Sequence, residues 1–354
     1  MGSTQAVRWT TKALAAMTNS DSIPIAASIY SDRQQAGVRV KTAAVGLALS
    51  CGYSGFAGAQ EAVSESFDAP LSVDEIALEL KNPVTGLRNL VWDYEGFTHQ
   101  GDLPGSDEQT GSRMVFTPTW PIELGNGKRL VLRATIPING DLPNWKPEPY
   151  LDYRDFTIRK VPEDEPRIAP TAGEFGYGHD HLGDIAFDVG YGGVSDTGLI
   201  SMYSLALVTP TSEDGSGTRN QWLLGPEFAL GRISDKSIYG FRAKHLTDIA
   251  GEGEQELGKL ATNETTLQLF LGYSLGNGWQ IESNPVILYD WEAVSGNEWL
   301  VPIGGGVSKT FRAGKRPMKL GVELQYYVVS PDRFGPEWLL RFSFTPLVYG
   351  QLFD

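Results

Sequence analysis

The sequence has little cysteine, little histidine and no long apolar run. Its 354 residues include one Cys and four His. A single Cys excludes a disulfide framework and a cysteine-rich zinc or iron–sulfur site. Because no stretch reaches the roughly 18 apolar residues that a spanning helix needs, an α-helical membrane protein is excluded as well.

The chain also lacks an excess of positive charge. Its formal net charge is −14, from 29 Lys and Arg against 43 Asp and Glu. This balance argues against nucleic acid as a partner, because phosphate binding needs a basic surface. Glycine and aromatic residues are frequent, at 41 Gly and 11% aromatics, whereas disordered acidic chains are poor in aromatics. The composition favours an all-β protein, either soluble or a membrane β-barrel.

Residues 1–59 predict a leader that ends in a secretory signal peptide. Arg39-Val40-Lys41 is a basic start, Thr42 to Ser54 is an apolar run of small residues, and Ala57-Gly58-Ala59 offers a cleavage site. The alternative is a small apolar segment of a protein core. The signal lies unusually late, so residues 1–37 are interpreted as an over-called gene start or a leader extension. We therefore expect an exported protein.

Residues 60–84 form an N-terminal segment with one helix signal. Ser72 and Glu75 match a capping box, which starts a short helix that runs through Leu80. Pro83 ends it. We interpret this helix as a plugging or periplasmic element that anchors the N-terminal segment.

Residues 85–354 show the period-2 alternation of strands. Leu320, Val322 and Leu324, for example, alternate with Gly321 and Glu323, which places the two sets on opposite faces. Strands of ten residues, tilted by about 45°, span about 23 Å, close to the apolar band of about 25 Å in an outer membrane. Twelve strands are predicted, at 88–97, 112–123, 129–139, 182–191, 199–209, 222–230, 239–248, 265–273, 279–290, 299–309, 319–328 and 338–348.

The connections between these strands alternate between short and long. Asn126-Gly127 and Asn277-Gly278 supply the positive φ angles that tight hairpins need. Short turns at one end and longer loops at the other are typical of a transmembrane barrel. The long connections are 98–111, 140–181, 210–221, 249–264, 291–298 and 329–337.

A soluble sandwich with its apolar face inward is the alternative fold. Two features argue against it: the strands carry one apolar face each, and aromatics such as Trp279 and Trp299 lie near strand ends, as in interfacial girdles. Pro118, Pro285 and Pro302 fall inside strands, where each removes a ladder hydrogen bond; bulges could accommodate them, but the sequence does not show bulges there. We predict an all-β, antiparallel, up-and-down transmembrane β-barrel of about twelve strands, with a short N-terminal helix.

Several segments resemble one family. They include Phe116-Thr-Pro-Thr-Trp-Pro-Ile122, Tyr289-Asp-Trp-Glu292, Trp299-Leu-Val-Pro-Ile303 and Gly335-Pro-Glu-Trp338. In this order, over about residues 74–348, the chain is similar to bacterial outer-membrane proteins assigned to the phenol meta-cleavage pathway, often labelled transporters and sometimes mislabelled neuromedin U. The resemblance implies an outer-membrane barrel with a transport role, with aromatic compounds among the candidate solutes. It carries over no catalytic motif.

The polar strand face supplies the candidate site. Its charged residues would be costly in hydrocarbon, so they must face water or one another. Either they line a narrow channel and bias what passes, or they form a salt-bridged network that fills the lumen. Because twelve strands enclose more space than the eight that side chains can fill, we favour a narrow channel, partly closed by loop 140–181. The predicted pore-lining residues are Arg113, Arg133, Asp184, Asp188, Glu227, Arg242, Lys244, Glu282, Glu323 and Arg341.

Catalytic and metal-binding signals are weak. His179-Asp180-His181 has suitable groups, but two histidines without further spaced ligands do not make a site. We therefore expect no enzyme activity, no cofactor and no metal.

The function predicted from the sequence is passive diffusion of small, aromatic or hydrophobic solutes through a charged lumen in the outer membrane of a Gram-negative cell. The expected partners are outer-membrane lipid, a small-molecule solute and, during insertion, the barrel-assembly machinery. The alternatives are a barrel-anchored envelope enzyme and a non-conducting structural or adhesion barrel.

Overall fold

The computed structural model describes residues 71–147, 173–178, 181–212, 221–251, 262–293 and 295–348. The chain divides into two units, Met1–Asp68 and Ala69–Asp354, and all described residues belong to the second. The predicted leader, residues 1–59, lies outside the described residues. Within the described ranges, no helix is long and apolar enough to span a membrane.

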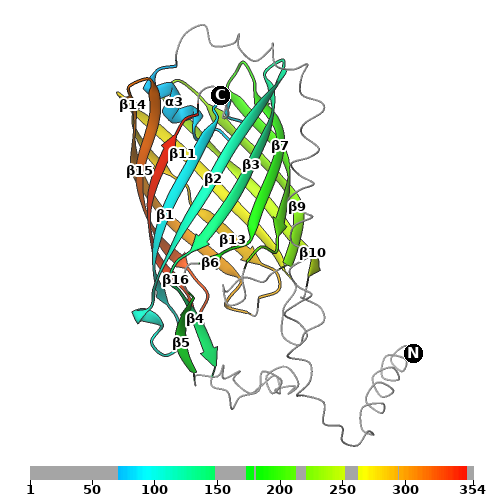
Figure 1. Ribbon diagram of the computed structural model, residues 1–354, viewed down its shortest axis with the longest axis vertical. Helices are drawn as coiled ribbons and strands as arrows, with labels where there is room; N and C mark the ends of the chain where they lie inside the picture. The colour runs from blue at the N-terminus through cyan, green and yellow to red at the C-terminus, as the bar shows by residue number, and fades with distance from the viewer. Residues whose placement is uncertain are drawn as a thin grey trace, which may run out of the picture. The chain divides into compact units, whose positions relative to one another are not determined.

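The second unit is a closed antiparallel β-barrel of twelve strands, as predicted (Figure 1). Each strand of the wall pairs with the next strand of the wall along the chain, so that β3 pairs with β7, and β1 pairs with β16 to close the barrel. The wall consists of β1 (Asn89–Gln100), β2 (Thr110–Gly125), β3 (Lys128–Asn139), β7 (Ile185–Val194), β8 (Leu199–Thr209), β9 (Gln221–Ile233), β10 (Ser237–Gly251), β11 (Asn263–Gly276), β12 and β13 (Trp279–Ser283 and Val286–Asp290), β14 (Trp299–Ala313), β15 (Arg316–Val329) and β16 (Gly335–Pro346).

The remaining elements lie at the two ends of the barrel. Helix α3 (Val73–Glu79) lies at the end with the short turns (Figure 1). At the opposite end, β4 (Leu142–Pro147) pairs with β5 (Gly173–Gly178), β6 (His181–Leu182) pairs with β3, and the 3-10 helix η1 spans Ser106–Glu108. The two ends are called the short-turn end and the long-loop end below.

The turns and prolines explain local departures from a regular ladder. Asn126 and Asn277 adopt φ angles of 52° and 54°, as their hairpins require. Pro302 lies at a β-bulge between β14 and β15, which accommodates its missing N–H. Pro285 instead splits the predicted strand 279–290 into β12 and β13, because proline has no N–H for the ladder; its carbonyl still accepts from Leu269 N of β11 at 3.0 Å. Pro118 stays in register with β1 without a bulge.

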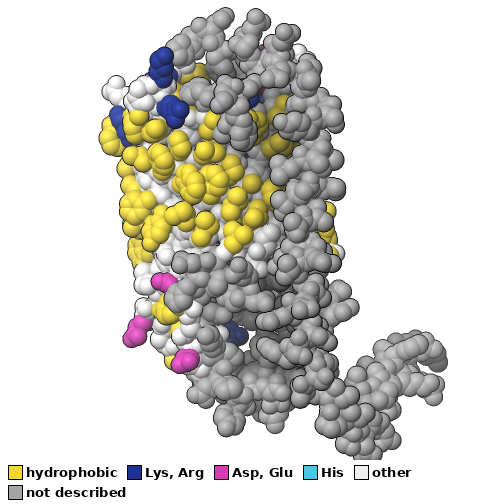
Figure 2. Space-filling model, viewed as in Figure 1, with side chains coloured by type: hydrophobic (Ala, Val, Ile, Leu, Met, Phe, Trp, Pro, Cys, Tyr) yellow, Lys and Arg dark blue, Asp and Glu magenta, His cyan; other side chains and the backbone are white. Residues whose placement is uncertain are grey.

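The apolar strand face points outward. Phe187, Val189 and Tyr191 on β7 are 43%, 46% and 49% exposed, whereas Asp188 between them is 5% exposed. Figure 2 shows the apolar side chains gathered in a band across the barrel wall. At the long-loop end, the ring centroids of Tyr289 and Trp299 lie 4.6 Å apart. Such a band with aromatics at its edge fits lipid on the outside, which rules out the soluble sandwich.

The buried apolar core is small and lies inside the barrel at the short-turn end. Leu78 and Val84, which precede β1, pack against Ile200, Met202, Ala229, Ile238 and Phe270 of the wall. A second cluster joins Ile76 and Leu87 to Leu347. The core therefore holds the segment before β1 in the lumen.

Candidate functional site: the barrel lumen

An N-terminal plug, residues 71–88, occupies the short-turn end of the lumen. Its helix begins at the predicted capping box: Glu75 N donates to Ser72 Oγ at 3.2 Å, and Ser72 N donates to Glu75 Oε2 at 2.7 Å. Asp74 accepts from Ser274 Oγ at 2.9 Å and from Gly278 N at 2.8 Å. The helix start is thus hydrogen-bonded to the turn between β11 and β12.

Charged groups also connect the plug to strand β3. Glu79 accepts from Gly86 N at 2.9 Å and lies 3.5 Å from Arg129 Nη1 of β3. Arg129 Nη1 also donates to Val84 O at 2.9 Å. Burial raises the pKa of the Glu79 carboxyl. The neighbouring Asn82 amide donates to the same carboxylate, so the loop after α3 is folded around it.

Lys81 carries the plug's positive charge into the lumen. Its Nζ donates to Asn284 Oδ1 at 2.7 Å and lies 3.2 Å from Glu282 Oε2. Burial lowers the pKa of Lys81 to about 8, and the nearby Glu282 opposes this shift. Sequence periodicity gave no signal for Lys81, because it lies outside the strands.

A network of ion pairs and hydrogen bonds continues from Lys81 along β12, β15, β16, β1 and β2, with Asn284 linking Lys81 to Glu323. Glu282 lies 2.6 Å from Lys319 Nζ, and Glu323 lies 3.0 Å from Arg341 Nη1. Glu95 then bridges Arg341, at 2.8 Å, and Arg113. Together with Asp93, which accepts from Ser343 Oγ, these residues form the balanced cluster: Lys81, Asp93, Glu95, Arg113, Glu282, Lys319, Glu323 and Arg341.

A second group, the Arg133 cluster, lies on β3, β7, β9 and β10. Lys244 Nζ is 2.7 Å from Asp188 and 3.3 Å from Glu227. Arg242 Nη2 donates to both oxygens of Glu227, at 2.8 and 3.0 Å. Arg133 donates to Pro83 O at 3.5 Å. The cluster therefore contains three cations and two carboxylates.

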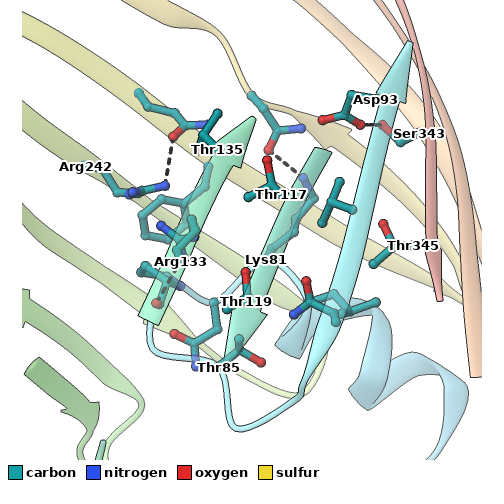
Figure 3. A pocket seen from close by; sticks show the side chains of 18 of the residues that line it. Lys81, Thr85, Asp93, Thr117, Thr119, Arg133, Thr135, Arg242, Ser343 and Thr345 are labelled. Atoms are coloured by element: carbon teal, nitrogen blue, oxygen red, sulfur yellow. Dashed lines mark hydrogen bonds between the residues drawn. The ribbon is translucent and has the colours of Figure 1, made fainter. Parts of the chain in front are cut away.

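Between the plug and these clusters, the lumen retains a cavity of about 430 Å³. Figure 3 shows Arg133, Thr119 and Thr135 on neighbouring strands at its wall, with Lys81 entering from the plug. Polar side chains dominate the lining, and Phe270 and Val286 add apolar surface. The site is thus a polar chamber inside a lipid-facing wall.

Eight of the ten predicted residues line this cavity, all except Arg113 and Asp184. Arg113 joins the balanced cluster through Glu95. Asp184 precedes β7 and accepts from Ser212 N at 3.0 Å. It thus joins the segment before β7 to the segment after β8 at the long-loop end. Their role in a conducting pore stays a prediction. Asp93, Glu95 and Lys319 were not among the predicted pore-lining residues, although the alternation along their strands places each on the inward face.

Most of loop 140–181 lies outside the described residues, including His179 and Asp180. Its described ends pair as β4 and β5, where the rings of Trp145 and Phe175 lie 4.9 Å apart. In the described ranges, the segment inside the lumen is the plug rather than this loop. Those ranges also contain no group of three or more His, Cys, Asp or Glu side chains arranged to hold a metal.

Comparisons with known proteins give information about the fold and not about the family. No protein-family model matches the sequence, and no curated protein matches it. The COG4313 outer membrane channel from Pseudomonas putida F1 is similar in structure, with a TM-score of 0.51 and 9% identity over 76% of this chain and 98% of that one. The family resemblance noted from sequence motifs therefore stays a prediction at the level of the named family.

Two further structures are more distant. The NanC porin has a TM-score of 0.42 and 9% identity, over 73% of this chain and all of that one. Outer membrane phospholipase A from Escherichia coli has a TM-score of 0.35 and 12% identity, over 79% of this chain and 99% of that one. Only the similarity to the COG4313 channel supports the fold, which is a β-barrel of the outer-membrane type.

Proposed function

We propose that the protein is a channel of the Gram-negative outer membrane that passes small solutes by passive diffusion. One observation carries the proposal: a polar cavity of about 430 Å³ lies inside a wall whose outer face is apolar. Polar residues inside a membrane protein mark a path for water, ions or solutes. Outer-membrane lipid and a small solute are the partners that this arrangement needs, and the barrel-assembly machinery acts during insertion.

The dimensions and the lining favour small solutes. A cavity of this volume accommodates one compact molecule. Its charged walls favour polar or charged groups, while Phe270 and Val286 suit an aromatic or hydrophobic part. The plug narrows the path at the short-turn end, so we expect low conductance.

A non-conducting structural barrel is the second candidate, favoured by the ion pairs between plug and wall. Lys81 joins Glu282, and Arg129 joins Glu79. An enzyme has less support. His245 bonds to Thr265 at the exposed surface, and His99 lies next to Gln109 O. Neither histidine lines the cavity, so neither reaches a solute there.

Conductance and liposome swelling of the refolded barrel separate these candidates. A channel gives discrete conductance steps and admits small solutes into liposomes. Shortening the plug is expected to increase both the size of the conductance steps and the rate of swelling. A matched variant is Asp196→Asn, which changes an exposed turn charge and is expected to conduct like the parent. No permeability to ions or small solutes, with or without the plug, would contradict the channel.

A further inference from the structure

We infer that the lumen cavity binds the carboxylate of a small amphipathic acid at Arg133. The inference rests on the proposed channel function and names a class of solute for it. Its starting point is an imbalance of charge inside the barrel. The balanced cluster contains four cations and four carboxylates, whereas the Arg133 cluster contains three cations and two carboxylates.

The two carboxylates of the Arg133 cluster are already engaged by other cations. Asp188 lies 2.7 Å from Lys244, and Glu227 holds both Arg242 and Lys244. In the described part of the chain, Arg133 has no carboxylate within 4.0 Å and one long hydrogen bond, to Pro83 O at 3.5 Å. A guanidinium has five N–H donors, so most of those on Arg133 remain available to a ligand.

An anion in this position would gain from both charge and geometry. A positive charge in a low-dielectric interior attracts a counter-ion more strongly than it would in water. The planar fork of a guanidinium matches the two oxygens of a carboxylate. A carboxylate is therefore a better match than a spherical anion.

Hydroxyl groups next to Arg133 complete the polar part of the subsite. Thr119 lies opposite Arg133 in the pairing of β2 and β3, and Thr135 follows on the same strand (Figure 3). Both line the cavity, and within the described residues their hydroxyls form no hydrogen bond. They can donate to carboxylate oxygens that Arg133 draws in.

The remaining lining sets the size and character of the acid. The cavity volume of about 430 Å³ suits a compact molecule, and Leu80, Phe270 and Val286 supply apolar surface. A short apolar or aromatic body with one carboxylate satisfies both parts. Benzoate is a suitable probe, and benzamide is its neutral match with the same ring and nearly the same shape.

Calorimetric titration of the folded, full-length barrel in detergent tests the inference. Benzoate is expected to bind at least about tenfold more tightly than benzamide, because charge-assisted hydrogen bonds are the stronger ones. Arg133→Gln removes this preference, and Arg133→Lys, which keeps the charge without the fork, gives an intermediate affinity. Arg232→Gln, at an exposed residue of β9 outside the cavity lining, leaves the preference intact.

Equal affinities for benzoate and benzamide in the unmodified protein would overturn the inference, and this comparison needs no variant to fold. Unchanged benzoate binding in folded Arg133→Gln would overturn it as well, as would displacement of benzoate by chloride at equal concentration. A barrel that binds benzoate but conducts nothing would refute only the channel. One that conducts but does not distinguish the two probes would refute only the carboxylate site.

Discussion

Lys81 is the residue that links the plug to the charged wall. Its ammonium meets Asn284 and Glu282, and Glu282 also pairs with Lys319. Two cations thus share one carboxylate in a buried place. Burial costs Lys81 part of its affinity for the proton, which is why its pKa is low.

This low pKa gives a pH dependence that can be measured. The pKa of Lys81 falls from 10.5 to about 8 on folding, so between these values the unfolded chain binds more protons. Stability then rises with pH in this window, by at most ~3 kcal/mol. Urea unfolding in lipid vesicles should show this rise in the unmodified protein, and it should disappear in Lys81→Met. Parallel curves for the two proteins would contradict the assignment, and Lys315→Met in an exposed turn serves as the control.

The alternation of residues along each strand predicted most of the side chains that line the lumen, because successive side chains of a strand point to opposite faces. Arg242 and Lys244 on β10, and Glu227 beside them on β9, point inward as the alternation required. This alternation does not show which charged side chains form ion pairs across the lumen. The bond from Lys244 to Asp188 joins β10 to β7, two strands that are not neighbours.

At the scale of elements, α3 and the loop after it behave as one plug. The capping box fixes the helix start, and Leu78 and Val84 bury their side chains against the wall. The sequence predicted the helix because capping is a local signal. It gave no sign that the helix faces Ile200, Met202 and Ile238, because that contact depends on the closure of the barrel.

Two substitutions in the plug should differ in effect. Leu78→Ala leaves a cavity in the core cluster and is expected to weaken plug docking by about 2–5 kcal/mol. Ser72→Ala removes one capping bond and is expected to cost about 1 kcal/mol. Limited proteolysis should cut residues 71–88 faster in Leu78→Ala than in Ser72→Ala, with the strands intact in both. Equal rates in both variants and the parent would show that these contacts do not hold the plug.

Strand ends were harder to predict than strand centres. The short turn predicted at 310–318 is only Gly314-Lys315, because β14 and β15 extend to Ala313 and from Arg316. The apolar alternation stops where lipid contact stops, while backbone hydrogen bonds continue. The break at Pro285 had a visible signal in the sequence, yet periodicity alone merged β12 and β13.

For the whole molecule, an outer apolar face and an inner polar face explain strand number, charge placement and plug together. Twelve strands leave more room than side chains from the wall alone fill, and the plug occupies part of it. The acidic net charge and the scarcity of cysteine and histidine do not enter this architecture. These features of the composition excluded other classes of protein. The barrel itself was predicted from the alternation of apolar and polar residues along the strands.

The most direct test compares the water accessibility of two residues on β3, in protein whose Cys51 is replaced by Ser. Leu132 is exposed on the outer face, and Thr135 lines the cavity. In vesicles, a small water-soluble thiol reagent should modify Thr135→Cys rapidly and lower its conductance, and it should leave Leu132→Cys unmodified. Modification of Leu132→Cys but not of Thr135→Cys, with no change in conductance, would contradict the account.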